Sequence, residues 1–258
     1  ETSPLLPVQP PDYTKFKLVP ALATAWCVGT LLVTYAVFAA TADKLEVIPY
    51  ISDTGAQPPA YYVFVFGLSV GGLLLLVSSW INRLWTLQWC QYFDQEGMLT
   101  FSSVVPTVWG AWIFASLASV FLAFLAIFSF DTYPVYHNFF AYLFFICFTL
   151  FIALNTYAGH KLQQVANVAI IGNFNTRAKF VAAGFAVFFF TLYMPIGLAL
   201  VYNIPNCDWT HKTSECPVLH SVRAVTQYLT VISYICYFVT VYLDLADTYV
   251  LAPSSEYV

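Results

Sequence analysis

Two short polar segments contain the residue types that a catalytic or ligand-binding site needs. The first, Ile51–Gly55, reads I-S-D-T-G, and the second, Asp131–Asn138, includes His137. A carboxylate such as Asp53 can orient a polar ligand, and a histidine such as His137 titrates near neutral pH and can meet a carboxylate. The hydroxyl of Ser52 could act as a nucleophile if a base and oxyanion donors lay beside it. These residue types therefore allow either ligand binding or acyl-transfer chemistry.

The same residues also fit a purely structural interpretation. Asp53 can accept hydrogen bonds from backbone N–H groups two residues on, and Gly55 can take a positive φ, which would make the first segment a rigid turn. Asp53, Asp131 and His137 would then form a hydrogen-bonded cluster that locks two loops together. The chain has no G-x-S-x-G, H-E-x-x-H, P-loop or dinucleotide-binding pattern. We therefore favour the structural cluster and predict no catalytic residue, no cofactor and no metal ion.

The composition indicates that lipid must surround the elements that position these segments. Hydrophobic residues make up 60% of the 258 residues and charged residues only 9%, and the mean hydropathy is +0.74. A soluble domain carries about 25% charged residues, so this chain lacks the residues to build an aqueous surface. A net charge of -4, scattered along the chain, gives no indication of nucleic-acid binding.

Six stretches are long and apolar enough to cross a bilayer as helices, which requires about 20 residues each. None has an Asp, Glu, Lys or Arg in its interior. The sequence therefore predicts an all-α polytopic membrane protein with six transmembrane helices in one bundle. We expect a tail at residues 1–18, the membrane domain at residues 19–247 and a second tail at residues 248–258. The predicted spans are Val19–Thr41, Tyr61–Ile81, Val108–Phe130, Phe139–Tyr157, Phe180–Tyr202 and Ala224–Leu243.

The distribution of basic residues predicts that both termini are cytosolic. An even number of spans puts the two termini on one side, and cytosolic segments carry an excess of Lys and Arg. The bias is six to three in favour of the side of the termini. That side holds Lys15, Lys17, Arg83, Lys161, Arg177 and Lys179, and the other side holds Lys44, Lys212 and Arg223.

The loop before the last span contains two cysteines that the predicted topology places in an oxidising compartment. Cys207 and Cys216 are close in sequence, so we predict that they form a disulfide. A zinc site made by these cysteines with His211 and His220 fits by spacing. We rank it below the disulfide, because cysteines in such compartments usually oxidise.

Two further pairs of residues lie in or at the ends of the predicted spans. Gly67 and Gly71 form a G-x-x-x-G face in the second span, which lets helices approach closely, and we expect it to pack inside the bundle. Asp244 and Asp247 share one face where the last span leaves the membrane. We expect them to be solvated, or to meet Lys161 or Arg177.

The N-terminal tail contains short patterns that sorting proteins read from the cytosol. Glu1, Leu5 and Leu6 match an acidic dileucine signal for clathrin adaptors. The stretch Pro10–Tyr13 fits the P-P-x-Y pattern that WW domains bind as polyproline II, and Tyr13–Phe16 fits a tyrosine-based sorting signal. The alternative is an unstructured polar tail.

The two polar segments also resemble those of a known family, the Frag/DRAM/Sfk superfamily, in which DRAM stands for damage-regulated autophagy modulator. Ile51–Gly55, followed by Pro58–Pro59 before the second span, resembles the signature of that superfamily. The stretch His137–Ala141, followed by Phe144–Phe145, is similar to its histidine-containing motif. The six-span layout agrees as well, so the resemblance covers Val19–Leu243.

The resemblance implies a six-helix membrane protein without an established catalytic centre. The superfamily includes lysosomal autophagy modulators, plasma-membrane partners of phosphatidylinositol 4-kinase complexes and a Golgi protein of GPI-anchor remodelling. By analogy, Asp53, Gly55 and His137 are the positions that carry over. The long loop with Cys207 and Cys216 departs from the endolysosomal branch, which leaves the subfamily open.

These observations together predict a non-enzymatic membrane regulator of endolysosomal, autophagic or phospholipid homeostasis. Its partners would be membrane lipids, clathrin adaptors at the N-terminal tail, and other membrane or peripheral proteins. Its location would be lysosomal or endosomal, with the plasma membrane and the Golgi as alternatives. A lipid-remodelling enzyme or enzyme subunit and a small-solute transporter or channel remain as alternative functions.

Overall fold

Six long apolar helices form the protein, and each is long and apolar enough to cross a membrane. The structure is a computed structural model that describes residues 13–41, 48–95, 97, 101–166, 173–199 and 217–246. It confirms the predicted all-helical architecture with six long helices. These are α1 (Leu18–Thr41), α3 (Ala60–Gln95), α4 (Phe101–Ile127), α5 (Pro134–Ala166), α6 (Asn173–Thr191) and α8 (Pro217–Ala246), and the short elements are η1 (Thr14–Phe16), α2 (Ile51–Thr54) and η2 (Leu192–Ile196).

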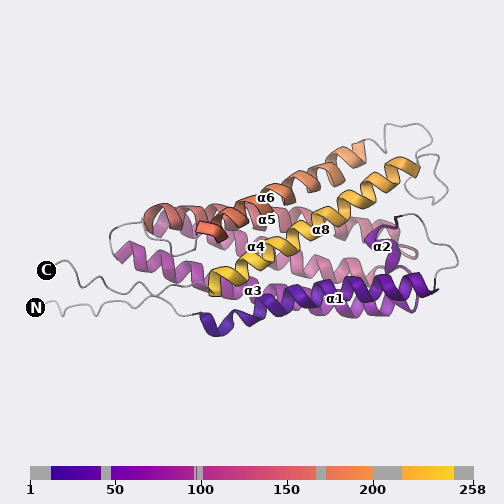
Figure 1. Cartoon of the computed structure of the whole chain (residues 1–258), viewed down its shortest axis with the longest axis horizontal. Helices are drawn as coiled ribbons and strands as arrows, with labels where there is room; N and C mark the ends of the chain where they lie inside the picture. Colours follow the sequence, from indigo (N-terminus) through magenta and orange to yellow (C-terminus); the bar gives the residue numbers. More distant parts are fainter. Residues whose placement is uncertain are drawn as a thin grey trace, which may run out of the picture.

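The helices form an elongated bundle (Figure 1), and their contacts close into a ring. Along the ring, α5 packs on α4, α4 on α3, α3 on α1, α1 on α8, α8 on α6, and α6 on α5. The short helix α2 lies at one end of the bundle, where it contacts α1 and α8. We call this end the α2 end. The opposite end, where α8 finishes, is called the Asp244 end.

Several helices extend beyond the spans predicted from the sequence. At 36 residues, α3 is about 54 Å long at 1.5 Å per residue, whereas the hydrocarbon core is about 30 Å thick. Charged residues that the sequence placed outside the spans therefore fall within helices. Arg83, Lys179, Arg223 and Asp244 are all buried, because these longer helix ends pack against one another rather than against water.

A second apolar cluster extends the core at the Asp244 end. It centres on Trp85, Trp89 and Phe93 of α3, which pack against the ends of α4, α5 and α8. Tyr13, which precedes η1, is partly buried against this cluster. The residue proposed for a tyrosine-based signal thus contributes packing at this end.

Glycines in α3 let neighbouring helices approach closely. A Cβ on Gly67 would lie 2.2 Å from the Cγ2 of Thr30, and one on Gly71 would lie 3.1 Å from the sulfur of Cys27. The indole N–H of Trp26 donates to the carbonyl oxygen of Gly67 at 2.8 Å. The G-x-x-x-G face therefore lies against α1 within the bundle.

Candidate functional site

The segment Ile51–Gly55 folds into a single helical turn that lies in the α2 end of the bundle. The carboxylate of Asp53 accepts a hydrogen bond from the backbone N–H of Tyr50 at 3.1 Å, and the backbone N–H of Asp53 donates to the carbonyl oxygen of Tyr50 at 3.0 Å. The hydroxyl of Thr54 donates to the carbonyl oxygen of Ile51 at 2.7 Å. Asp53 thus satisfies a donor at the start of the turn that has no partner within the helix.

Gly55 is needed for space rather than for an unusual backbone conformation. Its φ is −106°, so the expected positive φ is wrong. A Cβ at this position would lie 2.3 Å from the Cγ of Phe64. Phe64 is only 2% exposed, so the ring has little freedom to move away. A side chain at position 55 would push the turn out of the bundle end.

Two hydrogen bonds join this segment to the loop that contains Asp131. The amide nitrogen Nε2 of Gln57 donates to the carboxylate of Asp131 at 2.7 Å. The hydroxyl of Ser129 donates to the carbonyl oxygen of Ala56 at 2.7 Å. These two hydrogen bonds hold the segment that follows α2 against the loop between α4 and α5.

His137 is buried at the start of α5 and faces the backbone of α4. Its Nδ1 lies 2.8 Å from the carbonyl oxygen of Phe128. A carbonyl can only accept, so Nδ1 carries the proton in this contact. The ring also lies edge-on to Phe130. The sequence anticipated a carboxylate as the partner of His137, whereas this hydrogen bond goes to a main-chain oxygen.

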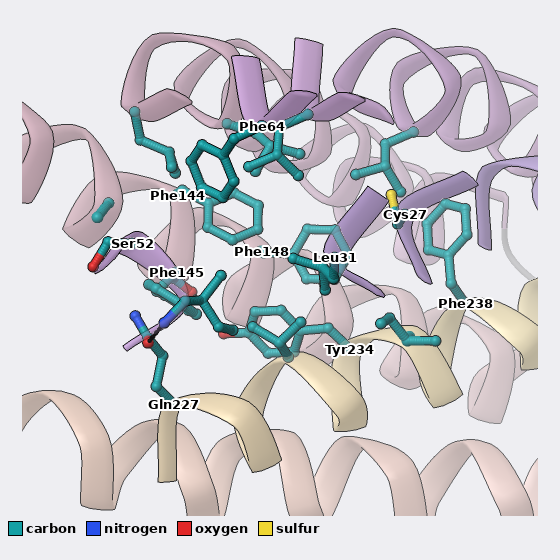
Figure 2. Close-up of a pocket in the computed structure, with 18 of the residues that line it drawn as sticks. Cys27, Leu31, Ser52, Phe64, Phe144, Phe145, Phe148, Gln227, Tyr234 and Phe238 are labelled. Atoms are coloured by element: carbon teal, nitrogen blue, oxygen red, sulfur yellow. Dashed lines mark hydrogen bonds between the residues drawn. The ribbon is translucent and has the colours of Figure 1, made fainter. Parts of the chain in front are cut away.

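A narrow apolar cavity lies behind the α2 turn, between α1, α3, α4, α5 and α8 (Figure 2). Its volume is about 100 Å³, and its lining extends along α5 from His137 to Phe148. That interval is about 16 Å at 1.5 Å per residue. Ser52 and Gln227 lie at one end of the view in Figure 2, and Cys27 and Phe238 lie at the other. The cavity is therefore a thin channel parallel to the helices, with Ser52, His137 and Gln227 at the α2 end.

Gln227 connects the cavity to three elements and was not identified from the sequence. Its Oε1 accepts from the backbone N–H of Ile51 at 2.9 Å, and its Nε2 donates to the hydroxyl of Tyr193 at 3.0 Å. Tyr193 belongs to η2, a single π-helical stretch that contains Pro195. A lone amide side chain in the last apolar span was the available signal, because polar side chains inside spans usually face the bundle interior.

The cavity adjoins a groove on the outside of the bundle. This groove, with a volume of about 510 Å³, lies between α1 and α8 and beside the α2 turn. Both spaces are lined by Leu31, Ile51 and Ile235. Leu32 and Tyr35, which also line the groove, are exposed on the outer face of α1. Three apolar side chains therefore separate the interior channel from the lipid-facing surface.

A buried ion pair joins α6 to α8 at the Asp244 end. The ammonium of Lys179 contacts the carboxylate of Asp244, which also accepts from the amide of Asn175 at 2.6 Å. The same amide donates to the carbonyl oxygen of Thr240 at 3.1 Å. The expectation that Asp244 is solvated was wrong. Only 1% of it is exposed, because α6 begins early enough to carry Lys179 against α8.

A second set of polar side chains lies in the same half of the bundle. The amide of Asn82 donates to the Oδ1 of Asn155 at 2.8 Å. The hydroxyl oxygen of Tyr237 accepts from Asn155 at 3.0 Å and from Thr156 at 3.1 Å. These bonds connect α3, α5 and α8, so polar contacts fix the Asp244 end while the channel occupies the interior towards the α2 end.

Some predicted sites fall outside the part of the chain that the structure describes. They are the sorting residues Glu1, Leu5 and Leu6 and the predicted disulfide Cys207–Cys216. Within the described residues, no group of three or more His, Cys, Asp or Glu side chains is arranged to hold a metal ion.

Comparison with known proteins identifies the family. The family described as Frag1/DRAM/Sfk1/Cwh43P N-terminal domain matches residues 15–248. No curated protein and no solved structure matches the chain. The matched range contains all six long helices, the α2 turn and the channel. The chain is an integral membrane protein with six candidate spans, and it belongs to the Frag1/DRAM/Sfk1 family.

Proposed function

We propose that this protein is a non-enzymatic membrane regulator of phospholipid or endolysosomal homeostasis, which holds one acyl chain of a membrane lipid in its interior channel. One observation carries the proposal. The channel is separated from a groove on the lipid-facing surface by only Leu31, Ile51 and Ile235. A lipid in the groove could therefore pass one chain between α1 and α8.

The apolar lining and the small volume of the channel favour an acyl chain over a bulky ligand. A volume of about 100 Å³ is smaller than the roughly 150 Å³ apolar cavity that binds benzene, so lining side chains must shift to admit a chain along the whole lining. Apolar cavities bind apolar ligands because no hydrogen bond to water is lost. Ser52 and Gln227 at the α2 end provide polar groups where the ester region of a lipid would lie.

The proposal is tested by narrowing the channel. Ala23 of α1 is buried and lines it, whereas Ala25 of the same helix faces outwards. We expect Ala23→Leu to reduce crosslinking of a phospholipid that carries a diazirine in its acyl chain. Ala25→Leu adds the same atoms to the outer surface and should leave crosslinking to the channel unchanged.

The measurement is mass spectrometry of crosslinked peptides from protein reconstituted in vesicles. Crosslinks to Phe148 or Tyr234, which line the channel, report its occupation. If the crosslinking yield at these residues is the same in Ala23→Leu as in Ala25→Leu and the wild-type protein, the channel does not hold an acyl chain.

The orientation in the membrane and the location in the cell are part of the same proposal. The excess of basic residues supports cytosolic termini, and the dileucine-like tail then supports delivery to lysosomes or endosomes by clathrin adaptors. Accessibility of the two termini and of the segment between α6 and α8 in sealed vesicles tests the orientation. Replacing Leu5 and Leu6 with Ala should move a fluorescently tagged protein away from these organelles. An unchanged location would refute the sorting signal.

A second candidate is a lipid-remodelling enzyme or subunit, and one observation favours it. Ser52 and His137 line the same channel, so a hydroxyl and an imidazole border the space proposed for the lipid. Acyl transfer through Ser52 requires the wild-type protein to change the lipids of defined vesicles and Ser52→Ala to abolish that change. Vesicles whose lipids stay unchanged with the wild-type protein exclude this candidate.

A further inference from the structure

Three tryptophan rings surround a buried arginine on α3 and α4. The guanidinium carbon of Arg83 lies 3.9 Å from the ring centre of Trp80, 4.2 Å from that of Trp109 and 4.6 Å from that of Trp112. Arg83 is only 6% exposed. We call these four residues the tryptophan box. Contact with ring faces stabilises the cation, but the N–H groups in the guanidinium plane still require acceptors.

The tryptophan box contains donors that have no acceptor. Nε and Nη1 of Arg83 and the indole Nε1 of Trp112 are buried, and within the described part of the chain none of the three has a hydrogen-bond partner. Arginine stays protonated in proteins, so it cannot relieve this by losing a proton. A membrane protein must satisfy its buried donors internally or with a ligand, because the hydrocarbon offers no partner. Three such donors in one place indicate a missing acceptor.

The position of the tryptophan box along the helix indicates where that acceptor comes from. Ala60 is the first residue of α3 and lies at the α2 end. Arg83 lies about 35 Å further along the same helix, at 1.5 Å per residue. The hydrocarbon core is about 30 Å thick, so the guanidinium lies near the boundary with the headgroups at the Asp244 end. Trp80 and Trp109 are 42% and 41% exposed. The tryptophan box therefore opens to the surrounding lipid rather than to the bundle interior.

We propose that the tryptophan box binds the phosphate of a phospholipid whose headgroup carries a net negative charge. The guanidinium of Arg83 has two edges, each a fork of paired N–H groups that matches two phosphate oxygens. One edge includes the unpartnered Nε, the other includes the unpartnered Nη1, and the Trp112 N–H supplies a further donor. The exposed rings of Trp80 and Trp109 are the side chains that move to admit the phosphate. This site lies towards the opposite end of the bundle from the polar end of the acyl-chain channel and does not depend on it.

The test measures binding of an anionic phospholipid to the full chain in phosphatidylcholine nanodiscs by native mass spectrometry. Arg83→Gln removes the cation and the fork, and we expect binding to weaken by about tenfold or more, since hydrogen bonds to charged groups are strong. Lys15→Gln is the matched control. It removes the same charge from an exposed residue of η1 at the same end and should change binding little.

Two further variants keep the test decisive if Arg83→Gln does not fold. Trp112→Phe retains a ring but removes one donor, so binding should weaken about threefold. Arg83→Lys retains the charge without the fork and should also bind more weakly than wild type. Equal binding by wild type and both variants overturns the proposal, as does an equal loss in Lys15→Gln.

Inorganic phosphate distinguishes a lipid from a free anion. In the same phosphatidylcholine discs with the anionic lipid present, inorganic phosphate that displaces the lipid at millimolar concentration, and does so only when Arg83 is intact, assigns the site to a free phosphate group. Failure to compete assigns it to the lipid headgroup. Failure of the acyl-chain crosslinking at Phe148 leaves this result unaffected, because the two measurements report on different ends of the bundle.

Discussion

Removing either partner of the Lys179–Asp244 ion pair should destabilise the protein far more than removing both. Lys179 and Asp244 are buried between α6 and α8, and removal of one member of such a pair leaves an uncompensated charge that costs about 3–5 kcal/mol. Asp244→Leu also removes the acceptor that Asn175 uses at 2.6 Å, so its loss of stability should lie near the upper end of this range. Lys179→Met leaves that hydrogen bond in place, so its loss of stability should lie near the lower end.

The double variant Lys179→Met/Asp244→Leu removes both charges and replaces the ion pair with an apolar contact. Replacement of a buried pair by apolar residues is often neutral or stabilising, and Asn175 keeps its bond to the carbonyl oxygen of Thr240. We therefore expect the double variant to lie within about 2 kcal/mol of wild type, with a coupling energy of about 3 kcal/mol or more.

The free energies of unfolding can be measured by denaturing titration of the purified protein in mixed micelles, with α6–α8 separation followed by a pair of fluorophores. Additive effects, in which the double variant loses as much as the two single variants together, would falsify the conclusion that the pair is desolvated. Single variants that each lose less than about 1 kcal/mol would place the pair in the class of exposed ion pairs.

The remaining predictions concern glycines where the structure distinguishes close packing from open space. Gly67→Ala should separate α1 from α3 and destabilise the bundle by about 1–3 kcal/mol, because its Cβ would lie 2.2 Å from Thr30. Thermal unfolding measures this loss. Gly184→Ala is the control and should be neutral in that assay, because its Cβ would meet nothing within 4 Å. Gly55→Ala should cost a similar amount by its clash with Phe64, and Phe64→Leu in the same chain should recover part of it. Equal melting temperatures for the Gly67 and Gly184 variants would contradict this account.

The overall fold could be predicted from the sequence because the bilayer imposes it. Runs of about 20 apolar residues have few alternatives to spanning helices, and all six were found. The ends of the helices were predicted less well. Lys179 and Asp244 looked like interfacial charges because hydropathy treats each residue alone. Their burial depends on a partner 65 positions away in the sequence, which no local pattern contains.

The candidate site was predicted only in part for a related reason. Ile51–Gly55 was identified as a turn, and Ser52 and His137 line one cavity, but their roles depend on neighbours from other helices. The need for glycine at position 55 comes from the ring of Phe64, and the hydrogen bond of His137 goes to a main-chain carbonyl. A main-chain acceptor has no signature in the sequence, so the partner of a histidine cannot be identified without the fold.

The position of Ile51 indicates how the I-S-D-T-G segment can affect lipid binding without touching the lipid through Asp53. Ile51 is the only residue of the α2 turn that both lies in the wall between channel and groove and bonds Gln227 through its backbone N–H. Asp53 supports that position by accepting from Tyr50 at 3.1 Å. Loss of this acceptor leaves a donor unsatisfied at a cost of about 1–3 kcal/mol.

Two substitutions at position 53 distinguish such support from a role for the charge. Asp53→Asn keeps an oxygen that can accept from Tyr50, so acyl-chain crosslinking in the channel should stay close to wild type, whereas Asp53→Ala removes the acceptor and should reduce crosslinking severalfold because Ile51 is no longer held in the wall. A catalytic or ligand-binding carboxylate predicts instead that Asn and Ala are equally damaging. If the two variants lose crosslinking equally, the charge of Asp53 has a functional role, and the conclusion that the turn acts through Ile51 is wrong.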